Sequence, residues 1–81
     1  MKRMDTTNEE NIIYELIHNK YDDCISRYIL EGIMLYEYNY APSRMYNIIM
    51  NLTLSDRMEL ILKNDGEYYQ LTGGKQWINE V

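Results

Sequence analysis

The sequence predicts a small α+β domain that is mainly helical, with three helices, a two-stranded β-hairpin and a short C-terminal helix in that order. Two observations carry this prediction. Apolar residues recur at three- and four-residue spacing from Ile12 to Leu52, as the buried face of a helix requires. After Ser55 the apolar residues alternate with a period of two, as on one face of a strand, and residues 64–67 have the composition of a turn.

Length and composition indicate one domain. The chain has 81 residues, enough for a single hydrophobic core, and no repeat or linker divides it. We therefore expect one domain over residues 1–81, with residues 1–7 as a flexible N-terminus. The apolar runs are far shorter than the roughly 20 residues that cross a membrane, and no apolar stretch follows Lys2 and Arg3 to form a signal peptide. Cys24 is the only cysteine, so an intrachain disulfide is excluded, and we expect a cytoplasmic protein with no membrane segment.

Local signals predict the first two helices. Thr7 and Glu10 have the spacing of a capping box, so the first helix is expected from about Asn8 to about Asn19. Asp22 and Asp23 suit the N-terminus of a second helix, which is expected from about Asp23 to Glu37. The apolar residues at helical spacing are Ile12, Ile13, Leu16 and Ile17 in the first helix and Ile25, Tyr28, Ile29, Gly32, Ile33 and Tyr36 in the second.

A third helix is predicted over about residues 42–53. Pro42 stands where a first-turn proline is favoured, because the N–H group that proline lacks would have no helical partner at that position. The stripe expected to be buried on this helix consists of Met45, Ile48, Ile49 and Leu52.

The hairpin is predicted from alternation and from turn residues. A first strand is expected over Met58–Lys63, with Met58, Leu60 and Leu62 on one face and Glu59, Ile61 and Lys63 on the other. The turn Asn64–Glu67 contains the Asp-Gly pair that favours a tight reversal, so the chain should return over Tyr68–Leu71. Residues Lys75–Val81 are long enough for a short closing helix that carries Trp77 and Ile78.

Residues 40–78 resemble the winged helix-turn-helix domains of small prokaryotic and viral DNA-binding regulators. Pro42–Leu52 is similar to their recognition helix, and Met58–Lys63 with Asp65–Thr72 is similar to their wing. The aromatic-rich second wing strand ends in Leu-Thr before a glycine, here Gly74, although the gap before that glycine is shorter than usual. The second helix is also longer than the usual positioning helix, and the resemblance is weak over the first two helices. It implies a winged-helix fold and a role in transcription regulation.

If the resemblance holds, the third helix enters the major groove of double-stranded DNA. A step of 100° per residue directs Ser43, Asn47, Met50 and Asn51 away from the buried stripe, with Arg44 and Tyr46 at the flanks. The residues expected to contact DNA are Ser43, Arg44, Tyr46, Asn47, Asn51, Arg57 and, at the tip of the wing, Lys63 and Asn64. Few basic residues lie near this surface, so binding requires two copies, and we expect a homodimer. The apolar side of the first helix, or Trp77 and Ile78, could form the dimer contact, although core packing explains both equally well.

The charge of the chain supports a different function. Thirteen acidic and eight basic residues give a net charge of −5, which does not suit general binding of a polyanion. Residues 1–40 hold eight of these acids and four of the bases. The alternative is an acidic winged-helix protein-interaction module, such as a phage-type inhibitor or DNA mimic, that docks on a basic partner. Its candidate contacts are Glu9, Glu10, Asp22 and Asp23, although helix capping also explains the two aspartates.

No residue pattern indicates an enzyme. His18 and Cys24 occur once each, and their spacing matches no recognised metal-ligand pair. Gly73-Gly74-Lys75 is too short for a phosphate-binding loop. We therefore expect no catalytic residue, no metal and no cofactor.

Overall fold

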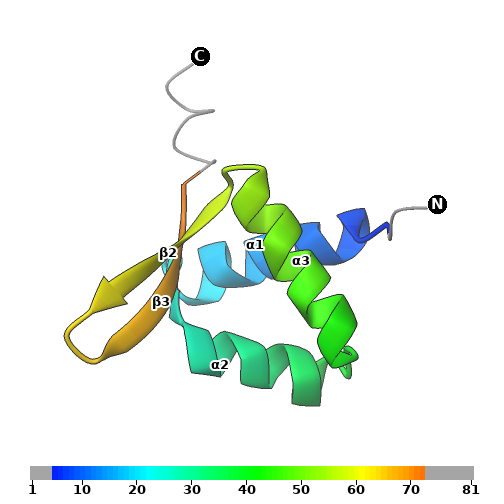
Figure 1. Cartoon of the computed structure of the whole chain (residues 1–81), viewed down its shortest axis with the longest axis horizontal. Coiled ribbons are helices and arrows are strands. Elements are labelled where there is room, and N and C mark those ends of the chain that lie inside the picture. Colours follow the sequence, from blue (N-terminus) through cyan, green and yellow to red (C-terminus); the bar gives the residue numbers. More distant parts are fainter. Residues whose placement is uncertain (1–4, 73–81) are drawn as a thin grey trace.

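The computed structural model describes residues 5–72, which form three helices and a three-stranded antiparallel sheet (Figure 1). The elements are α1 (Thr7–Lys20), β1 (Cys24–Ser26), α2 (Arg27–Gly32) with its π-helical continuation η1 (Ile33–Glu37), α3 (Pro42–Leu54), β2 (Met58–Lys63) and β3 (Gly66–Leu71). This α+β arrangement is consistent with the order of elements in a winged helix. None of the helices in this part of the chain is long and apolar enough to cross a membrane. The helix expected over Lys75–Val81, with Trp77 and Ile78, lies outside the described residues.

The sheet contains one more strand than the sequence predicted. Its order is β1-β3-β2, so β3 is the central strand and β2 is an edge strand. Ile25 in β1 pairs with Tyr69 in β3, and the backbone N–H of Leu71 donates to the carbonyl of Asp23. The hairpin β2-β3 was predicted correctly, with Lys63 opposite Gly66 across the turn. Gly66 has a φ of +138°, a conformation that side chains other than glycine rarely adopt.

The predicted start of the second helix was wrong. Asp22 and Asp23 have φ angles of 56° and 71°, in the left-handed region, whereas an N-cap residue is extended. Residues Cys24–Ser26 are extended as β1, and α2 begins only at Arg27. The Asp23 carboxylate contacts His18 at 2.7 Å instead of capping a helix. The predicted end at Glu37 was correct.

The first helix has the expected bounds to within one residue, but its predicted capping box is absent. Thr6 is the N-cap residue and makes no side-chain cap. Its hydroxyl donates to Glu10 Oε2 at 2.5 Å, so the carboxylate of Glu10 turns into the protein and does not reach back to the helix end. Asp5 accepts a hydrogen bond from the Thr7 backbone N–H at 3.1 Å, which lowers the pKa of the Asp5 carboxyl.

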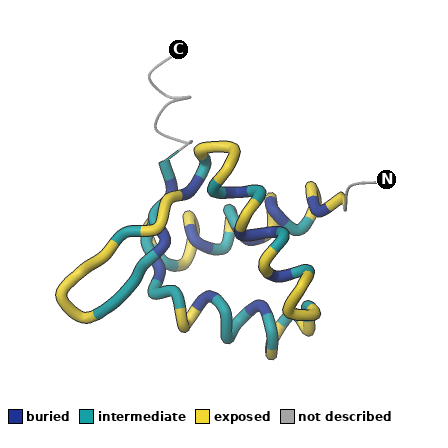
Figure 2. Tube along the Cα trace, in the orientation of Figure 1, coloured by how far each residue is buried: buried dark blue, intermediate teal, exposed yellow. Residues whose placement is uncertain are grey.

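The core lies where α1, α2, η1 and α3 meet the base of the sheet. The predicted stripe on α3 was correct, since all four of its residues are buried. The rest of the core comprises Ile13, Ile17, Ile25, Leu30, Met34, Met58, Tyr69 and Leu71. The apolar face of β2 is buried only at its start, because Met58 is 1% exposed but Leu60 and Leu62 are 46% and 79% exposed. The hairpin extends beyond the helices, so its outer part is uncovered (Figures 1 and 2).

Candidate interaction surface on α3 and β2

The face of α3 opposite the core is mostly apolar. Tyr46, Met50 and Leu54 follow one another at four-residue intervals and are 52%, 54% and 74% exposed. Ser43 is also exposed, and the Asn47 side-chain amide donates to the Ser43 carbonyl at 2.8 Å. The sequence correctly predicted that Ser43, Asn47 and Met50 lie on the side of α3 away from the buried stripe, whereas Tyr46 was expected at its flank. It gave no weight to Leu54, which continues the apolar row.

Asn51 does not belong to that outer face. Its side-chain amide donates to Thr6 Oγ1 at 2.9 Å and to Glu10 Oε2 at 3.1 Å, so it points toward the start of α1. Arg57 donates to the other oxygen of the same carboxylate, Glu10 Oε1, at 2.6 Å. Glu10 is 8% exposed, and its carboxylate therefore joins α1, α3 and the turn before β2 in one polar network. Two residues expected to contact DNA are thus engaged inside the protein.

The second arginine near α3 is paired in the same way. Arg44 Nη2 donates to Glu9 Oε2 at 2.8 Å, and this hydrogen bond lowers the pKa of the Glu9 carboxyl. Arg27, on α2, pairs with both Glu31 and Glu67. Every arginine between residues 5 and 72 therefore has a glutamate partner. A nucleic-acid phosphate would have to displace these carboxylates to bind the guanidinium groups.

The tip of the hairpin is different, because its lysine has no carboxylate partner among the described residues. Lys63 and Asn64 are exposed, and Lys63 Nζ lies 4.6 Å from the centroid of the Tyr68 ring. The Tyr68 hydroxyl donates to Asp65 Oδ2 at 2.8 Å, and this hydrogen bond raises the pKa of Tyr68.

The four acidic residues predicted as a partner site do not form one surface. Glu9 and Glu10 lie in the first turn of α1, whereas Asp22 and Asp23 follow its last residue, Lys20. A 14-residue helix is about 20 Å long, so the two pairs lie at opposite ends of α1. Glu9 and Glu10 are moreover neutralised by arginines. Of the four residues, Asp22 is exposed and Glu10 is buried.

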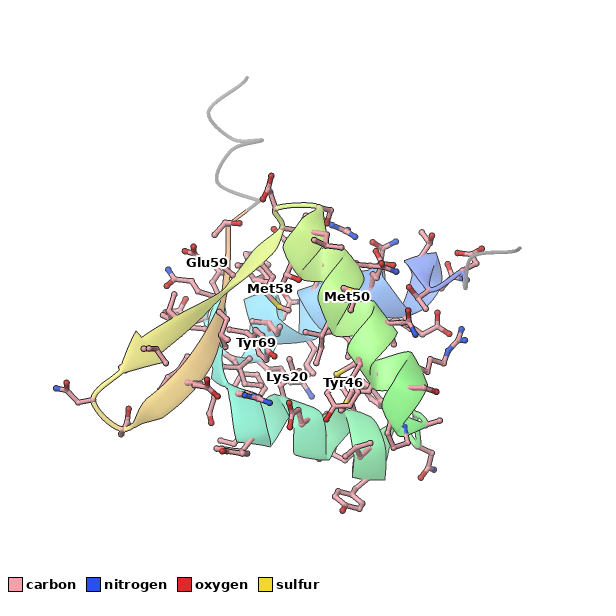
Figure 3. The ribbon with its side chains drawn as sticks, viewed as in Figure 1. Lys20, Tyr46, Met50, Met58, Glu59 and Tyr69 are labelled. Carbon is pink, nitrogen blue, oxygen red and sulfur yellow. The ribbon has the colours of Figure 1, made fainter. Side chains whose placement is uncertain are left out.

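A groove that the sequence did not predict lies between α3 and the sheet. Its volume is about 640 Å³, and its lining residues are Ile49, Thr53, Asp56, Met58, Glu59, Leu60, Tyr69 and Thr72. Ile49, Met58 and Tyr69 are nearly fully buried and form an apolar floor. The charged lining residues are Asp56 and Glu59, which are exposed and pair with no basic side chain within residues 5–72. Figure 3 shows Tyr46 and Met50 on α3 and Met58, Glu59 and Tyr69 on the two strands. Nothing in the pattern of β2 indicated a groove.

We call the exposed face of α3 (Tyr46, Met50 and Leu54) together with this groove the α3–β2 surface. Ile49 and Thr53 line the groove and lie one helical turn from Tyr46 and Met50, so the two parts are continuous on α3.

The Arg44–Glu9 pair should make stability depend on pH. A carboxylate whose pKa is lower in the folded state stabilises that state above the unfolded pKa, and the contribution is lost as pH falls through the folded pKa. We expect the free energy of unfolding to fall between about pH 5 and pH 3, and Arg44→Leu to reduce that fall. Urea denaturation at several pH values measures both. An equal fall in Arg44→Leu would show that the pair contributes nothing to the pH dependence.

No family model, no curated protein and no solved structure matches the chain.

Proposed function

We propose that this chain is a winged-helix domain that binds a protein partner through the α3–β2 surface. The observation that carries the proposal is the row Tyr46, Met50 and Leu54, in which each large side chain is more than half exposed. Contiguous exposed apolar side chains of this kind mark interaction sites, because water is released from them on binding. Side chains of a partner can insert into the groove beside this row and contact its apolar floor.

The winged-helix assignment is supported by the order α1, β1, α2, α3, β2, β3 and by the sheet order β1-β3-β2. The sequence resemblance of Pro42–Leu52 to a recognition helix, and of Met58–Lys63 with Asp65–Thr72 to a wing, also supports it. A fold of this kind does not by itself determine function, so the chemistry of the surface must decide between protein and DNA.

Charge favours a protein partner with a basic surface. Non-specific affinity for DNA comes from lysine and arginine side chains that neutralise phosphates. Here Arg44 and Arg57 are already paired with Glu9 and Glu10, and the net charge of −5 repels a polyanion. The same net charge, with Asp56 in the groove, attracts a cationic partner.

DNA binding is the second candidate, and one observation favours it. No described element covers the outer face of α3, which is the face that the third helix of a winged helix presents to the major groove. Asn47 could bond an adenine edge, Met50 could contact a thymine methyl group, and Lys63 with Asn64 could contact a phosphate.

One experiment separates the two candidates. The purified full chain is panned against a displayed random peptide library and, in parallel, against random duplex DNA at low salt. We expect enriched peptides whose affinity falls at least about tenfold in Met50→Glu, because a charge would be buried in an apolar contact. Ile12→Glu is the matched control, since Ile12 is 47% exposed on α1 and outside this surface.

The opposite result would replace the proposal. If duplex DNA of one sequence is enriched, and if that binding is lost in Asn47→Ala but kept in Ile12→Glu, then α3 reads DNA. Peptides that bind Met50→Glu as tightly as the unaltered chain would show that the protein-binding site lies elsewhere.

A further inference from the structure

We propose that β2 pairs with the β2 strand of a second copy of this chain, in antiparallel orientation with the twofold axis at Ile61. This inference goes beyond the proposed function, because it concerns the backbone edge of β2 and not the apolar row on α3, although Glu59 and Leu60 belong to both surfaces. It differs from both dimer contacts expected from the sequence: Ile13 and Ile17 on α1 are fully buried, and Trp77 and Ile78 lie outside the described residues.

The outer edge of β2 is free in the part of the chain that the structure describes. The sheet order β1-β3-β2 leaves β2 paired on one side only. The strand projects beyond the helices, and Leu60 and Leu62 are among its most exposed residues. An exposed apolar edge strand carries unpaired N–H and C=O groups that can pair with another strand.

The direction of the backbone groups along β2 follows from two hydrogen bonds. The N–H of Thr72 donates to the carbonyl of Arg57, whereas the N–H of Leu71 donates to Asp23 on the β1 side. Backbone N–H and C=O groups alternate in direction along a strand. Those of Glu59, Ile61 and Lys63 therefore point toward β3, as those of Arg57 do. Leu60 and Leu62 therefore direct their N–H and C=O groups to the free edge.

This parity permits a symmetric pairing centred on Ile61. In it Leu60 lies opposite Leu62 of the second copy, and both residues have outward backbone groups, as a hydrogen-bonded antiparallel pair requires. Each such pair exchanges two hydrogen bonds, and symmetry provides two pairs. Ile61 lies opposite its own copy as a non-bonded pair at the axis.

The side chains of the strand are complementary in the same register. Glu59 lies opposite Lys63 of the second copy, and Lys63 lies opposite Glu59 of the second copy, on one face of the joined sheet. Leu60 and Leu62 meet across the axis on the other face. Two chains of net charge −5 repel each other over most of their surfaces. At both ends of the paired strands, however, a glutamate of one copy faces a lysine of the other, and these unlike charges attract. The second copy thereby covers the leucines that the hairpin leaves exposed.

The test is the mass of the full chain in solution, measured by sedimentation equilibrium from about 10 to 500 μM. We expect the mass to rise with concentration toward twice the 9.8 kDa of one chain. Lys63→Glu should weaken association by about tenfold or more, because two ion pairs become like-charge contacts. The double change Glu59→Lys with Lys63→Glu should restore it, since the charges are then exchanged and again unlike. Lys20→Glu, which makes the same change of net charge at an exposed position of α1, should associate like the unaltered chain or lose at most a small factor.

Leu62→Pro provides a second variant that keeps the hairpin, because it removes an N–H group that bonds only to the second copy. Amide hydrogen exchange at Leu60 and Leu62 should slow as concentration rises, and Leu62→Pro should abolish association. A chain that stays monomeric over the whole range overturns the proposal. A dimer that is unaffected by Lys63→Glu, or in which these two amides exchange freely, overturns it as well.

Discussion

Glu10→Ala should lower the free energy of unfolding by about 2 to 3 kcal/mol, or roughly 10 to 20 °C in Tm for a domain of this size. The Glu10 side chain is 11% exposed, and its carboxylate accepts hydrogen bonds from Thr6, Asn51 and Arg57. Removing it leaves a partly buried guanidinium without its partner, which costs more than the net value of the lost pair. Small domains have only about 5 to 15 kcal/mol of stability, so the effect is large.

Glu9→Ala is the matched control for that experiment. Glu9 precedes Glu10 on α1 and also pairs with an arginine, but the Glu9 and Arg44 side chains are 23% and 34% exposed. More exposed ion pairs of this kind contribute about 1 kcal/mol or less. Urea denaturation of both variants at pH 7 measures the difference. Equal losses in the two variants would show that Glu10 is not the centre of a buried network.

This network also explains why the candidate DNA contacts could not be judged from the sequence. Helical periodicity predicted correctly that Met45 and Ile48 face the core, because each position's neighbours along the helix determine its face. It could not predict that Arg44 and Asn51 meet α1, because those contacts join residues far apart in the chain. The pairing of Arg57 with Glu10 depends on the packing of α1 against α3 in the same way.

The strands also differ in whether residues adjacent in sequence or residues far apart in the chain determine them. The hairpin was predictable because its alternation and its Asp65-Gly66 turn are adjacent in sequence. β1 was not, since three residues show too little alternation, and Ile25 finds its partner Tyr69 only in the folded chain. Alternation placed Leu60 on the same face as Met58, but it does not identify the element that covers that face. In the structure no described element covers the outer half of that face.

Ile48→Ala should have the largest effect on stability, a loss of about 3 to 4 kcal/mol, because it removes buried methyl groups and leaves a cavity in the core. Ile48 is fully buried at the centre of α3, which contacts α1, η1 and β2. Met50→Ala, two residues later on the same helix, should cost less than about 0.5 kcal/mol, because Met50 is 54% exposed and its replacement leaves no cavity. Thermal and urea unfolding measure both variants. The contrast between the two variants tests the orientation of α3, on which the α3–β2 surface depends. Similar losses of stability in both would mean that Met50 is packed within the protein. A partner could not then bind there without unfolding part of the domain.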